Sequence, residues 1–143
     1  MLKTVVSQSS GNTVITGGSI DGTPIGAATP STGAFTTLSA QTITFNSQVN
    51  NATTTGAITI NWTTSNYQLQ AAPTGTITYT FTAPTGVSHL QLFIAAPATA
   101  QTINWPGNLY WLGATWSGTN NKASVISMFY DGTNYYAIGS TQV

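Results

Sequence analysis

The chain has 143 residues, no cysteine and a formal net charge of zero, and only 3 % of its residues are charged, against about 25 % in ordinary soluble domains. The missing cysteines exclude disulfides and thiolate metal sites, and two basic residues are too few for phosphate recognition, which argues against a nucleic-acid partner. The hydrophobic fraction of 41 % is too high for a disordered chain, while no run reaches the roughly 18 apolar residues of a membrane span, which argues against a membrane partner.

The first part of the chain, residues 1–41, is rich in small residues and turn signals. One short β-like run, Asn12–Thr16, precedes the turn-forming stretches Gly17-Gly18, Asp21–Pro24 and Thr29–Gly33. Such a segment cannot bury its own apolar side chains, so we predict an extended attachment arm that lies on another surface. Its anchors for its own domain or a neighbouring subunit are predicted to be Ile20, Ile25, Phe35 and Leu38.

The second part, residues 42–143, is predicted to be one β-domain. Nine segments read as strands, several of which alternate polar and apolar residues, and turn signals lie between them at about 8–12-residue spacing. These segments are 41–46, 57–62, 67–71, 75–81, 89–95, 102–105, 109–112, 124–130 and 135–139. The last two flank "DGTN", Asp131–Asn134, a hairpin-turn signal. We therefore expect an all-β fold, an antiparallel, jelly-roll-like β-sandwich with an extended N-terminal arm.

Two short sequence echoes occur within the predicted domain. "TINW" occupies 59–62 and 102–105, and "APTG" occupies 72–75 and 83–86. Neither echo extends to a solenoid-like period. We interpret them as reused local turn and strand chemistry, with a duplicated sheet inside one sandwich as the alternative.

The residues available for catalysis are few. A Ser–His–Asp arrangement would have to combine His89 with Asp21 or Asp131, but both aspartates lie in turn signals, where they favour local hydrogen bonds. Glycosidase chemistry would need these two aspartates to face each other. We predict no enzymatic activity, no cofactor and no metal, although three copies of His89 around a three-fold axis would offer one ion site.

Aromatic residues concentrate towards the C-terminal end. Exposed Trp or Tyr can stack on sugar rings, whereas buried ones fill cores and subunit interfaces. We expect most of them to be buried. Trp111 and Trp116, near the turn-rich "WLGATWSGTNNK", are the candidates for exposed aromatic contacts.

Two stretches resemble virion proteins of tailed bacteriophages. "DGTPIGAATPSTGAFTTLSA", 21–40, is similar to a connector motif of phage fibre, tail and head-decorating proteins. Residues 58–139 resemble a fibre-type β-domain in the order Trp62, "TITYTFTAP", "LQLFI", "TINWP", Trp111 and "YDGTNYY". The "NLYWLG" segment departs from that pattern, which affects the expected detail of this loop.

This resemblance implies a virion structural protein that forms a homotrimer and attaches through its N-terminal part. The near-zero net charge also favours association over repulsion. We expect a capsid decoration (cement or head-fibre) protein, made in the host cytoplasm and located on the particle surface, with the major capsid protein or other virion subunits as partners. The alternatives are a tail-fibre or tail-tip module that binds host glycans and, third, a hydrolase dependent on His89.

Overall fold

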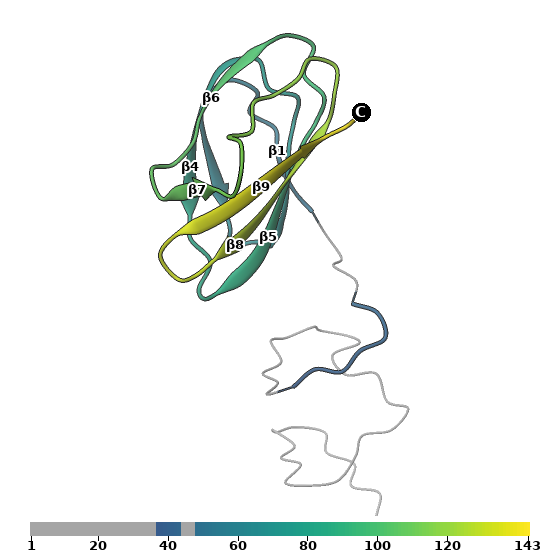
Figure 1. Ribbon diagram of the computed structural model, residues 1–143, viewed down its shortest axis with the longest axis vertical. Helices are drawn as coiled ribbons and strands as arrows, with labels where there is room; N and C mark the ends of the chain where they lie inside the picture. The colour runs from purple at the N-terminus through teal and green to yellow at the C-terminus, as the bar shows by residue number, and fades with distance from the viewer. Residues whose placement is uncertain (1–36, 44–47) are drawn as a thin grey trace, which may run out of the picture. The chain divides into compact units, whose positions relative to one another are not determined.

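Figure 1 shows a computed structural model of the chain, in which residues 37–43 and 48–143 are described. The chain divides into two units, Met1–Gln41 and Thr42–Val143. Residues 37–41 of the first unit form no helix or strand. The β-like run expected over residues 12–16 lies outside the described residues, as do residues 44–46 of the segment expected at 41–46.

The described part of the second unit consists of strands and their connections, without a helix. Its strands are β1 (Val49–Asn51), β2 (Gly56–Asn61), β3 (Tyr67–Gln70), β4 (Gly75–Thr82), β5 (Ser88–Ile94), β6 (Gln101–Asn104), β7 (Leu109–Trp111), β8 (Ser124–Tyr130) and β9 (Tyr135–Thr141). The all-β prediction is confirmed, and β2 to β9 lie where strands were expected. Strand β1 was not expected, and residues 41–43 form no strand.

The strands form two sheets. One has six strands in the order β1-β3-β5-β8-β9-β7, and the other has three in the order β2-β4-β6. From β1 to β7 the chain enters the two sheets alternately, so each coil contributes one strand to each sheet. Successive coils pair in parallel, with Val49 beside Gln68 and Gly75 beside Gln101.

This β-solenoid-like stack corrects the antiparallel, jelly-roll-like prediction. Strand pairs β1–β3, β3–β5, β2–β4, β4–β6 and β7–β9 are parallel, and only β5–β8 and β8–β9 are antiparallel among the described strands. Alternation reports which face of a strand is buried, but it does not report the direction of the neighbouring strand. Coils of unequal length also leave no fixed sequence period.

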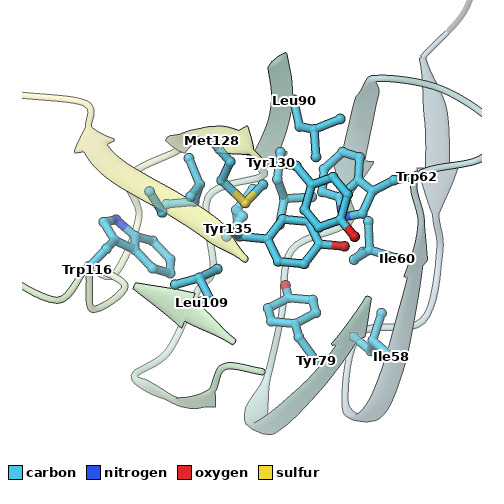
Figure 2. Packing of buried hydrophobic residues seen from close by; sticks show 14 of the residues in the cluster. Ile58, Ile60, Trp62, Tyr79, Leu90, Leu109, Trp116, Met128, Tyr130 and Tyr135 are labelled. Carbon is cyan, nitrogen blue, oxygen red and sulfur yellow. The ribbon is translucent and has the colours of Figure 1, made fainter. Parts of the chain in front are cut away.

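The hydrophobic core lies between the two sheets. Ile58, Ile60, Ile77 and Tyr79 come from the three-stranded sheet, and Leu90, Leu92, Ile126, Met128 and Tyr135 come from the six-stranded one. Figure 2 shows the rings of Tyr130 and Tyr135 beside each other in this layer, with ring centroids 4.6 Å apart. Burial of these side chains holds the coils together and fixes which residues face outwards.

Strand β3 places two glutamines in the interior. Gln68 and Gln70 are fully buried, and their amides bind backbone oxygens at the corners of the coils. Gln68 Nε2 donates to the carbonyl oxygens of Asn61 and Ser65, each at 3.0 Å, and Gln70 Nε2 donates to Thr53 O at 2.6 Å. Because buried polar groups need partners, these amides link β3 to the preceding turns and turn Tyr67 and Leu69 outwards.

Among the described residues, we found no helix with the length and apolar character needed to cross a membrane.

Candidate interaction surface

The outer faces of the two sheets differ in chemistry. On the three-stranded sheet the alternate, outward-facing positions are mostly threonines. These exposed residues are Thr59, Thr76, Thr78, Thr80, Thr82 and Thr102. Their hydroxyls keep this face hydrated, and Thr78 Oγ1 accepts a hydrogen bond from Asn104 Nδ2 at 3.2 Å.

The outer face of the six-stranded sheet carries a cross-strand line of four rings, here called the aromatic row: His89, Phe129, Tyr136 and Tyr110. His89 pairs with Phe129 across β5 and β8, Phe129 pairs with Tyr136 across β8 and β9, and Tyr136 pairs with Tyr110 across β9 and β7. The ring centroids of His89 and Phe129 lie 5.5 Å apart, and those of Tyr110 and Tyr136 lie 5.9 Å apart in a stacked arrangement.

Large apolar side chains remain exposed along the outer face of this sheet. Tyr110 is 51 % exposed and Ile138 is 53 % exposed, and Phe129 and Phe93 each expose more than a third of their surface. Scattered exposed hydrophobic residues are common, but a contiguous group on one sheet face is a mark of an interaction site. The outer face of the six-stranded sheet is therefore the candidate surface.

The hairpin turn between β8 and β9 lies next to Phe129 and Tyr136, the two middle members of the aromatic row. The backbone N–H groups of Asn134 and Thr133 donate to Asp131 Oδ1 at 2.7 and 2.8 Å, and these bonds hold the pKa of that carboxyl below its ordinary value. The charge of Asp131 in turn raises the pKa of the Tyr136 hydroxyl. This end of the face thus combines stacked rings with one negative charge.

A shallow pocket of about 480 Å³ lies at the opposite end of the same strands. It is lined by Phe93, Ala123, Ser124, Val125, Ser140, Thr141 and Gln142. Phe93, Val125 and Ser140 are neighbours in the strand register, so they share the outer face with the aromatic row. The face therefore has bulky rings at one end and a hollow at the other.

The predicted attachment residues are described only in part. Leu38 is 58 % exposed, as a side chain that contacts another surface would be in an isolated chain. Ile20, Ile25 and Phe35 lie outside the described residues.

The prediction that Trp116 is exposed is wrong, because only 8 % of its surface is accessible. Its ring fits against Gly139, where a Cβ atom would come within 2.7 Å of the Trp116 side chain. Its Nε1 donates to Thr141 Oγ1 at 3.0 Å. Trp111 is half-buried and packs against the core, with its ring centroid 5.3 Å from that of Trp105.

The residues considered for catalysis have other contacts. The exposed His89 ring lies against Phe129, and the Asp131 carboxylate accepts hydrogen bonds from its own turn. Asp21 lies outside the described residues. Within the described part of the chain, no group of three or more His, Cys, Asp or Glu residues is placed to hold a metal ion.

The sequence pattern did not single out Tyr110, Phe93 or Phe129, which are exposed on this face. In the run "LYW", Leu109 and Trp111 share one side of β7 and Tyr110 projects from the other. The signal for this exposure is strand phase, since alternate residues of a strand face opposite sides of the sheet.

In β3 the apolar residues Tyr67 and Leu69 are the ones that strand phase would predict to be buried. The structure instead buries Gln68 and Gln70 and turns Tyr67 and Leu69 outwards.

Comparison of the chain with protein-family models, curated proteins and solved structures found no match.

Proposed function

We propose that this chain is a structural subunit of a tailed-bacteriophage virion, a homotrimeric decoration protein that binds and stabilises the capsid. Residues 1–41 attach to the major capsid protein or to other virion subunits, and the β-domain projects from the particle surface. The observation that carries the proposal is the exposed, aromatic outer face of the six-stranded sheet, in a chain with only 3 % charged residues. The resemblance of residues 21–40 to the phage connector motif supplies the virion context.

The physical argument is that this surface is suited to contact with protein. Interface cores are depleted in charged residues and enriched in aromatic ones. A subunit that binds only the assembled shell stabilises that shell by mass action. Neither contact requires a catalytic residue, a cofactor or a metal.

Deletion of residues 1–40 tests the attachment role. The β-domain has its own core and is expected to stay folded, because its buried side chains come from both of its sheets. Capsid binding, measured by co-sedimentation with undecorated particles, is expected to be lost. The full-length double variant Phe35→Ser and Leu38→Ser should weaken binding in the same direction, and decoration by the truncated protein at the wild-type level would contradict the proposal.

A second candidate function is recognition of a host glycan in a tail-fibre or tail-tip module. The observation in its favour is the stacked Tyr110–Tyr136 pair beside the Asp131 carboxylate, since sugar recognition combines an aromatic platform with polar groups. A glycan array would show selective binding that Tyr110→Ala removes. The variant Tyr67→Ala, on the same sheet but away from this pair, serves as the control.

A further inference from the structure

We propose that the outer face of the six-stranded sheet is a self-association surface on which two copies of the chain meet head to tail. The aromatic row of one copy lies over the pocket beside Val125 of a second copy. This self-association surface rests on the proposed function in one respect: the closed assembly is taken to contain three copies, as that function states.

The two ends of the face are complementary to each other in shape, so the aromatic end of one copy can meet the pocket end of the next. The aromatic row lies at the β8–β9 turn, and the pocket lies at the far ends of β8 and β9. Ligand-sized pockets begin at roughly 300 Å³, so a hollow of about 480 Å³ has room for an aromatic side chain. A head-to-head arrangement would instead oppose rings with rings and leave both hollows uncovered.

The two charged residues lie at opposite ends of this face. Lys122 and Asp131 are the charged residues of the described part of the chain. Lys122 precedes Ala123 at the pocket end, and Asp131 follows β8 at the aromatic end. Head-to-tail contact brings the Asp131 end of one copy to the Lys122 end of the next, whereas head-to-head contact brings like charges together. Such pairs select orientation more than they add affinity.

The middle of the face also favours a second copy over a sugar. Ile138 pairs with Ser127, and Ser127 pairs with Gln91, so the strip between the two ends carries apolar and neutral polar side chains. Two copies can therefore approach without burying an unpaired charge there. A glycan would use the Tyr110–Tyr136 end and would leave Ile138 and the pocket without a role.

The first experiment measures the oligomeric state of the full-length protein by light scattering and sedimentation equilibrium, without capsids. Ile138→Lys would place a charge in the middle of the face and is expected to weaken association at least tenfold. Thr80→Lys adds the same charge to an exposed position on the other sheet and is expected to associate like the wild type. Thermal unfolding of both variants shows that each remains folded.

Two results would overturn the proposal: a wild-type protein that stays monomeric, or an Ile138→Lys protein that associates as the wild type does. A monomeric wild type would also remove the homotrimer from the proposed function, but because capsids are absent, neither result bears on capsid attachment, which has its own test. Conversely, if the truncated protein still bound capsids, the result on self-association would stand.

A second experiment tests orientation and uses the absence of native cysteine. Phe129→Cys and Ser140→Cys are prepared separately, mixed and treated with a short bis-maleimide. Head-to-tail contact is expected to yield mainly cross-links between the two variants. Products in which each variant links mainly to itself would show that the copies do not meet in this orientation.

Discussion

Single residues decide which aromatic side chains are buried. Trp116 lies inside because Gly139 has no side chain in its path, and its indole N–H meets the hydroxyl of Thr141. That hydroxyl also lies 3.0 Å from Ser124 Oγ. Trp116 is therefore part of the core and not a surface contact, because Gly139 leaves room for its ring and the Thr141 hydroxyl accepts its N–H.

Gly139→Ala is expected to destabilise the domain by about 1–3 kcal/mol, the usual cost of overpacking. The new methyl group would meet the Cβ and Cγ atoms of Trp116, which cannot rotate away as the end of a flexible side chain would. The free energy of urea-induced unfolding measures this cost. Gly86→Ala is the matched control, because no atom lies within 4 Å of its added Cβ, and an equal loss in both variants would refute the explanation.

At the scale of elements, the β8–β9 hairpin connects two antiparallel neighbours that lie between β5 and β7 in the six-stranded sheet. Its turn depends on Asp131, whose carboxylate binds two backbone N–H groups, and on Gly132, whose φ of 106° favours glycine. The "DGTN" signal predicted this turn correctly. The turn also sets the register that places Phe129 beside Tyr136.

The hairpin is expected to make stability depend on pH in the acid range. The pKa of Asp131 lies below its ordinary value of 3.8 in the folded chain. The ionised carboxylate therefore stabilises the fold above pH 3.8, and this stabilisation is lost as the pH falls through the folded pKa. Asp131→Asn keeps an acceptor oxygen but cannot titrate. Unfolding free energies measured from neutral to acid pH should fall less steeply for this variant, and identical slopes would contradict the assignment.

At the scale of the whole molecule, two sheets enclose a core that contains buried phenols. Tyr79 and Tyr135 are almost inaccessible to solvent, and burial raises the pKa of both, to about 12 for Tyr135. Neither hydroxyl has a hydrogen-bond partner among the described residues. The core therefore retains these tyrosines for the packing of their rings, such as the stacking of Tyr79 on Trp105.

The domain is expected to lose stability as the pH rises from 10 towards 12. Unfolding exposes phenols that ionise near 10.0, whereas the folded chain keeps them neutral, so stability is fully present below 10 and declines above it. Tyr79→Phe should reduce the loss of stability at alkaline pH. The variant should lose little unfolding free energy at neutral pH, because it removes a hydroxyl without a partner. Circular dichroism against pH measures the transition, and Tyr110→Phe, at an exposed position, should leave it unchanged.

The strand positions could largely be predicted from the sequence, but the candidate surface could not. Strand positions followed from alternation, as in "GTITYTF", where Ile77 and Tyr79 are buried and the intervening threonines are exposed. The aromatic row was not predicted, because it depends on which strands are neighbours. His89 and Tyr110 belong to strands separated by two others in the sheet, and no local pattern encodes that order.

The sequence by itself determined an all-β chain with little charge, the phase of most strands and the β8–β9 turn. These properties depend on side-chain type and on contacts between near neighbours. Only the tertiary structure decided the parallel stacking of coils, the burial of Gln68 and Gln70 and the position of Trp116. Each of these depends on groups distant in sequence: the facing strand, the corner carbonyl that accepts an amide, and the glycine that leaves room for a ring.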